Sequence, residues 1–192
     1  MANTDAPNGF IAVNQFGSSY NGETIRVVFA AADATAAFVG DLVTLTGTLD
    51  TTDNKTPTVE QADASDTLIF GVVQSFEQDP DDMSNTQRTA STRRFAYVHP
   101  ATDDLYLQAQ EDSVGGSIAA ASAGLNVNFI VGTGSSVSGS GMEIDSSTVA
   151  TTATLPLKLI RPANDTGNAL GTNCKWLCKI NNSALSNVTL GV

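Results

Sequence analysis

The stretch TLIFGVVQSF, residues 67–76, constrains the fold more than any other part of the chain. Its apolar residues run almost without a break around Gly71 instead of alternating with polar ones. Such a run suits a β-strand buried on both faces, with a bend or bulge at the glycine. Polar segments at 63–66 and 77–92 bound the run on either side. We therefore expect this strand to be central to the fold.

Elsewhere in the chain, apolar and polar residues alternate in short segments, which is the pattern of half-buried strands. The predicted strands lie at 24–30, 41–46, 56–62, 93–99, 105–110, 126–131, 154–160 and 173–181. The short connection 100–104 is typical of a hairpin between its two flanking strands. Many short strands separated by long polar loops, at 77–92 and 132–141 above all, favour a closed or doubly layered β architecture.

The sequence therefore predicts an all-β protein. Its main part, residues 21–192, is expected to be a single β-barrel or jelly-roll-like sandwich domain. Residues 1–20 are expected to form an extended N-terminal arm, because their start is polar.

The final predicted strand carries both cysteines of the chain. Its alternation places Cys174, Trp176, Cys178 and Ile180 on one face. At about 3.3 Å per residue the two cysteines stand about 13 Å apart, which is too far for a disulfide within the strand. We expect two buried thiols and a buried tryptophan.

The charge of the chain narrows its range of partners. Twenty acidic residues against nine basic ones give a formal net charge of −11. Such a chain repels nucleic-acid phosphates and anionic lipid headgroups. The first ten residues lack the basic and apolar segments of a signal peptide, and no apolar run approaches the length of a membrane span. We expect no nucleic-acid partner and no membrane partner.

The residues that usually perform catalysis are few and badly placed. His99 is the single histidine, and it precedes a proline at a predicted strand end, where a surface or turn role is expected. The carboxylate pairs Asp103-Asp104 and Glu111-Asp112 are adjacent in sequence, so on a strand their side chains would point to opposite faces. We expect no catalytic site, and we assign no metal or other cofactor.

One basic cluster remains. Arg88, Arg93 and Arg94 follow the acidic segment 79–82, whose carboxylates match no calcium loop of defined spacing. The three arginines have two possible roles: they form polar contacts with an acidic partner surface, or they brace the nearby aspartates.

Several segments together resemble a family of tailed-bacteriophage capsid decoration, or cement, proteins, and the likeness spans nearly the whole chain. The segments that carry it are 1–10, 38–43, 71–73, 94–98, 105–112, 145–147 and 171–182, which include Phe38-Val-Gly-Asp-Leu-Val43 and Cys174-Lys-Trp-Leu-Cys178. The resemblance transfers no catalytic residues.

The resemblance implies a structural virion protein that is made in the host cytoplasm and binds the exterior of an assembled capsid. Such a protein would stabilise the shell by bridging subunits of the major capsid protein. Three copies of the protein itself would associate as a homotrimer. Phe10, Phe16 and Tyr20 are the residues of the N-terminal arm expected to contact the capsid. Two alternatives stay open at this point, another virion component such as a head fibre or tail protein, and a carbohydrate-binding β module.

Overall fold

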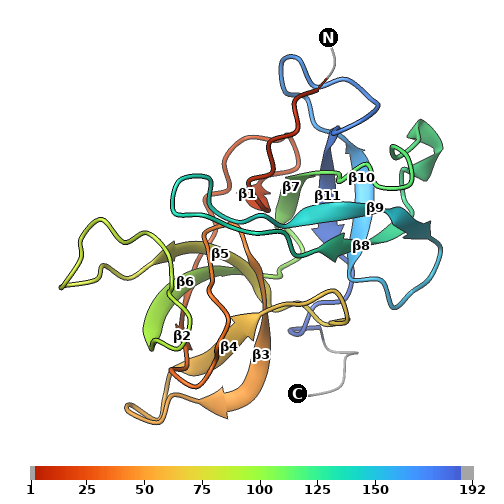
Figure 1. Cartoon of the computed structure of the whole chain (residues 1–192). Helices are drawn as coiled ribbons and strands as arrows, with labels where there is room; N and C mark the ends of the chain where they lie inside the picture. Colours follow the sequence, from red (N-terminus) through yellow and green to blue (C-terminus); the bar gives the residue numbers. More distant parts are fainter. Residues whose placement is uncertain (1–2, 187–192) are drawn as a thin grey trace.

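The computed structural model describes residues 3–186 and consists of two β units (Figure 1). Five strands close into a barrel in the order β2 (Ile25–Phe29), β4 (Pro57–Gln61), β3 (Leu42–Leu49), β5 (Gly71–Phe76) and β6 (Arg94–Pro100). Six strands form a sheet in the order β1 (Ile11–Val13), β7 (Tyr106–Gln110), β11 (Lys175–Ile180), β10 (Leu157–Pro162), β8 (Asn126–Ile130) and β9 (Glu143–Ala150). The predicted all-β class is confirmed.

Strand β5 is a wall shared by two hydrophobic cores. Val73 belongs to the core inside the barrel, whereas Val72 belongs to the core between the barrel and the six-stranded sheet. The strand is therefore buried on both faces, as its continuous apolar run predicts. The irregularity in pairing falls between Val73 and Ser75 rather than at Gly71. Gly71 is required for another reason, since a Cβ there would collide with the backbone carbonyl of His99.

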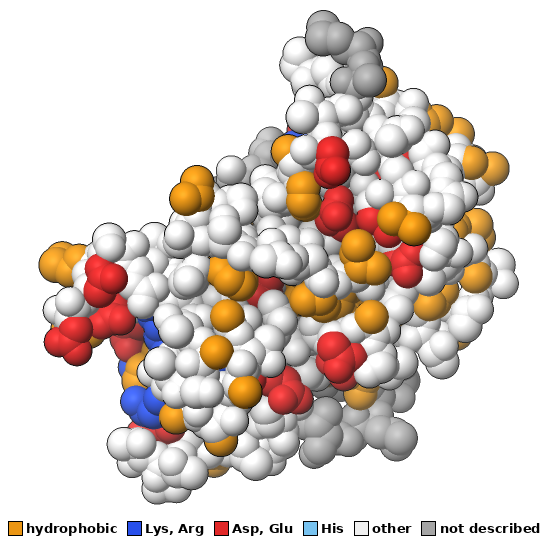
Figure 2. Space-filling view, in the orientation of Figure 1, with side chains coloured by type: hydrophobic (Ala, Val, Ile, Leu, Met, Phe, Trp, Pro, Cys, Tyr) orange, Lys and Arg blue, Asp and Glu red, His pale blue; other side chains and the backbone are white. Residues whose placement is uncertain are grey.

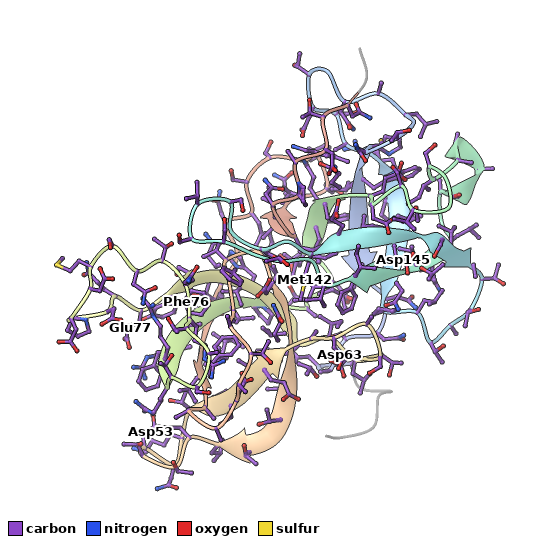
Figure 3. All side chains as sticks on the ribbon, viewed as in Figure 1. Asp53, Asp63, Phe76, Glu77, Met142 and Asp145 are labelled. Atoms are coloured by element: carbon purple, nitrogen blue, oxygen red, sulfur yellow. The ribbon has the colours of Figure 1, made fainter. Side chains whose placement is uncertain are left out.

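Strand β3 contributes to the same shared wall. Leu42 faces the core of the sheet and Val43 faces the core of the barrel. The backbone N–H of Leu42 donates to the sulfur of Met142 at 3.2 Å, so the residue that precedes β9 is tied directly to the barrel. Met142 lies where the two units meet (Figure 3). The barrel and the sheet are thus joined through the core that Leu42 and Val72 enter, while the inside of the barrel forms a core of its own.

The predicted hairpin between 93–99 and 105–110 is wrong. Strand β6 pairs with β2 and β5 inside the barrel, whereas β7 pairs with β1 and β11 in the other sheet. The connection carries the chain from one unit to the other, held by a hydrogen bond from Ala101 N to Phe70 O at 2.8 Å. Alternation predicts which face of a strand is buried, but it does not predict the strand's partner.

The N-terminal segment follows the surface of the sheet along its described length. The Asn3 side chain hydrogen-bonds to the backbone of Ala169 and of Thr172. Phe10 is only 1% exposed and meets Phe129 edge to face in the core. Strand β1 then pairs with β7, and a tight turn at 14–18 leads the chain back along β1.

Two strands, β1 and β9, are not predicted from the sequence, because the first is very short and the second is mostly polar. β1 has only three residues, and β9 consists of Glu-Ile-Asp-Ser-Ser-Thr-Val-Ala with a single fully buried side chain, Ile144. Both lie at the edges of the six-stranded sheet, where polar residues are tolerated and discourage further pairing. The described residues contain one helical turn, Ala120–Ser122, and no helix that is long and apolar enough to cross a membrane.

Both cysteines are free and buried, as predicted. Cys174, Trp176 and Cys178 are completely enclosed in the core of the sheet, and Ile180 packs against it. Burial raises the pKa of the Cys174 thiol to about 11 and that of Cys178 to about 12. Because the thiolate is the reactive form, neither cysteine is suited to redox chemistry.

Glu143, the first residue of β9, makes the stability of the fold depend on pH. Its Oε1 atom is buried without a hydrogen-bond partner. Burial, and then the charges of Asp5 and Asp112, raise the pKa of the carboxyl from 4.5 to about 7. Since the folded state binds this proton more tightly than the unfolded state, the associated stability is present below about pH 4.5 and is lost as the pH rises towards 7.

Replacing Glu143 by Gln is therefore expected to raise the free energy of unfolding at pH 8 by about 1–2 kcal/mol, because no buried charge then has to be accommodated. The gain should vanish at pH 4, where Glu143 is protonated in the folded protein. Urea unfolding at both pH values measures the difference. Glu23→Gln, at an exposed position, is the matched control. An equal gain at both pH values would contradict the assignment.

Candidate protein-contact surface

A long loop projects from the barrel between β5 and β6. We call residues 77–92 the acidic loop, because Glu77, Asp79, Asp81 and Asp82 lie in its first half. Acidic side chains cover its projecting end, on the left of Figure 2. Met83 follows them in sequence and is 72% exposed, so an apolar side chain stands among carboxylates near the tip. As predicted, the loop is long and mostly exposed.

Arg94 closes the base of the acidic loop. Its side chain is buried and donates to the backbone carbonyls of both legs of the loop, at Glu77 (3.0 Å), Asn85 (2.7 Å) and Gln87. The guanidinium also lies 5.5 Å from the ring centre of Phe76. Phe76 and Glu77 mark the point where the loop leaves the barrel (Figure 3). The Arg94 guanidinium therefore fixes the distance between the two ends of the acidic loop.

Arg88 ties the other end of the acidic loop to the barrel and is 0% exposed. Its side chain donates to the carboxylate of Asp33 at 2.9 Å and to four backbone carbonyls. The acceptors among the carbonyls are those of Ala30, Asp33, Thr35 and Thr92. Burial lowers the pKa of Arg88, and the charge of Asp33 opposes that shift. All five N–H donors of an arginine are thus used inside the protein.

Arg93 forms a two-pronged ion pair with Asp50, at 2.9 and 2.7 Å. Its hydrogen bonds lower the pKa of the Asp50 carboxyl. Arg93 and Arg26 both stack on the ring of Phe95, at 4.4 and 3.5 Å from its centre. Arg88 and Arg93 therefore brace aspartates, but these are Asp33 and Asp50 and not the nearby carboxylates of segment 79–82. Arg94 braces backbone carbonyls instead, which the sequence does not predict.

A second loop lies beside the acidic loop. We call residues 131–142 the serine loop; reciprocal backbone hydrogen bonds between Ser135 and Gly139, at 2.8 and 2.9 Å, hold its tip. Thr86 of the acidic loop donates to the carbonyl of Ser136 at 3.3 Å. A hollow of about 300 Å³ separates the two loops. Val137 at the tip is 96% exposed, so this rigid turn presents an apolar side chain to solvent.

The two loops together form a preformed surface suited to binding another protein. Met83 and Val137 are exposed apolar side chains on backbones that buried arginines and tight turns hold in place. A surface already in its bound shape loses less conformational entropy on association. The nearby carboxylates favour a partner with basic or hydrogen-bond-donating groups. Within residues 3–186, no group of three or more His, Cys, Asp or Glu side chains is arranged to hold a metal ion.

The structure separates the three predicted residues of the N-terminal segment. Phe10 anchors the segment to the protein's own core, so its side chain does not face a neighbour. Phe16 is 73% exposed at the tip of the turn 14–18. Tyr20 lies edge-on against His99, with ring centres 5.1 Å apart. His99 itself is buried, which corrects the expectation of a surface position.

Met83 and Val137 are not among the residues predicted from the sequence, although the sequence carries a signal for each. Each is an isolated apolar residue inside an otherwise polar loop, where no core position is expected. No family model matches the chain, and no curated protein or solved structure matches it significantly. Fold and surface define an all-β protein with two adjacent, mostly polar loops that project from its surface.

Proposed function

We propose that the protein is a virion component that binds the exterior of an assembled tailed-phage capsid and stabilises it by bridging subunits of the major capsid protein. It acts by contact and not by catalysis. The observation that carries this proposal is the pair of adjacent loops with Met83 and Val137 exposed near their tips. Buried arginines hold the acidic loop, and backbone hydrogen bonds hold the serine loop. A preformed surface of this kind suits repeated docking against a fixed lattice.

The capsid shell would be stabilised by thermodynamic linkage, that is, by binding that favours the assembled state. A protein that binds the assembled shell, and not the dissociated subunits, stabilises the shell in proportion to its occupancy and affinity. A homotrimer would present three copies of the loops, so modest individual contacts would combine into strong attachment. The net charge of −11 keeps such a protein away from packaged nucleic acid and favours solubility at high local concentration.

Bridging two capsid subunits requires a second contact on each copy. Phe16 is the candidate on the N-terminal segment, since its ring stands exposed on a turn braced by the Asn14 side chain, which accepts from Phe16 N at 2.9 Å and Ser18 N at 3.2 Å. Phe16→Ser removes the apolar ring without disturbing the core, whereas deletion of the whole segment would also remove the buried Phe10.

The test is co-sedimentation with capsid shells of the phage that encodes the chain, after light scattering has measured the mass of the free protein. We expect a trimer that pellets with assembled shells in fixed stoichiometry and ignores dissociated subunits. Phe16→Ser should reduce the bound fraction. A monomer that stays in the supernatant at all shell concentrations would overturn the proposal and favour a different role.

A further inference from the structure

A separate groove lies between the turn of the N-terminal segment and the connection that links the barrel to the sheet. It encloses about 530 Å³. Asn14, Gln15 and residues 19–22 line one side, and Asp103, Asp104 and Tyr106 line the other. The acidic loop, the serine loop and Phe16 contribute nothing to its lining. The groove is therefore distinct from the contact surface described above.

The groove is built from residues far apart in the sequence and held by specific contacts. The Tyr20 hydroxyl donates to Asp104 at 3.0 Å, and the Thr102 hydroxyl donates to the other oxygen of the same carboxylate at 2.7 Å. A side chain at Gly22 would collide with the Tyr20 ring, so the glycine lets that ring lie against the backbone. Lys179 lies over the Tyr106 ring, 5.1 Å from its centre, and donates to the carbonyl of Asp103.

The lining has the chemistry that recognises sugars. Two half-buried tyrosines, Tyr20 and Tyr106, line the groove. The backbone at Gly22 lies against one ring and Lys179 lies over the other, so each ring has its opposite face to offer to the C–H face of a pyranose ring. Asn14, Gln15 and Asn21 offer amide donors and acceptors for hydroxyl groups. The Asp103 carboxylate is exposed and accepts no hydrogen bond from another side chain among the described residues. A carboxylate with free lone pairs can accept from two vicinal hydroxyls.

Other ligand classes fit less well. Anionic ligands face Asp103 and Asp104 on a chain of net charge −11. An extended peptide would need an open strand edge, but the chain's own residues 18–20 already pair with β1 beside the groove. Few apolar side chains line the groove, so a hydrophobic ligand would bury little apolar surface.

We propose that this groove binds a neutral carbohydrate, with Tyr106 and Tyr20 as stacking platforms and Asp103 as the hydroxyl acceptor. Such a site would let a protein at a virion surface adhere to glycans without hydrolysing them. The inference goes beyond capsid attachment and does not depend on it, because it rests on different residues.

The test is NMR titration of the isotope-labelled full-length protein with neutral trisaccharides, namely cellotriose, maltotriose, mannotriose and chitotriose, and with trigalacturonic acid as the anionic comparison. We expect at least one neutral sugar to bind with a dissociation constant of about 0.1–10 mM and to shift the resonances of the groove. Tyr106→Ala and Asp103→Asn should each weaken binding about tenfold, through loss of a stacked ring or of a charged acceptor.

Matched variants separate the site from effects on folding. Tyr106→Phe keeps the ring and should retain most of the affinity, while Asp81→Asn removes an exposed carboxylate elsewhere and should change nothing. No shift with any neutral sugar up to about 10 mM, or preferential binding of trigalacturonic acid, would overturn the proposal. Groove resonances that respond only to capsid shells would also overturn it, since the occupant would then be the capsid protein. Tyr106→Ala should still co-sediment with shells, so the two proposals can fail separately.

Discussion

Replacing Arg88 by Met is expected to lower the free energy of unfolding by about 3–5 kcal/mol, the cost of breaking one side of a buried ion pair. The substitution leaves the Asp33 carboxylate and four backbone carbonyls without their donor. A buried acceptor that loses its partner retains the full penalty of desolvation. Urea unfolding followed by the fluorescence of Trp176, the single tryptophan, measures the loss.

Arg26→Met is the control for this prediction. Arg26 pairs with Glu77 at 3.1 Å, but the two side chains are 40% and 42% exposed, against 0% for Arg88. Solvent screens such a pair, and its loss should cost about 1 kcal/mol or less. Equal losses for the two variants would show that burial of Arg88 does not determine the stability of this region.

The double substitution Met83→Ser and Val137→Ser is expected to weaken binding to capsid shells about a hundredfold. Each side chain is largely exposed in the free protein, and burial of an apolar side chain of this size contributes about 1.5–3 kcal/mol. At the lower end of this range two such losses amount to about 3 kcal/mol, which corresponds to roughly a hundredfold in affinity. Quantitative co-sedimentation over a range of shell concentrations measures the change.

The stability of the double variant should match that of the parent, because neither side chain packs in a core. Leu170→Ser provides the control, since Leu170 is also an exposed apolar residue but lies in the connection between β10 and β11. It should bind shells like the parent. Full binding by the double variant, or equal loss with Leu170→Ser, would exclude the loop tips as the contact.

The sequence predicts burial better than it predicts pairing. The continuous run around Gly71 correctly indicates a strand buried on both faces, because each apolar residue there has a core to enter. Alternation likewise places Cys174, Trp176 and Cys178 inside. The partners of β6 and β7 could not be predicted in this way, since a short connection serves a hairpin and a crossing between sheets equally well.

The candidate surfaces are harder to predict for a related reason. Phe10 and Phe16 are the same residue type in the same segment, yet one is in the core and the other is exposed at a turn. The difference depends on how β1 pairs with β7, a contact between distant parts of the chain. The partners of Arg94 are equally hard to predict from the sequence. They are backbone carbonyls, which come within reach of the side chain only when the acidic loop has folded.

Amide hydrogen exchange, compared between the free protein and the protein bound to capsid shells, tests the role of the loops most directly. We predict slower exchange in the bound protein across 77–87 and 132–140, while the exposed connection around Leu170 exchanges at an unchanged rate. Protection confined to other surfaces, with both loops exchanging as in the free protein, would contradict the assignment of these loops as the capsid contact.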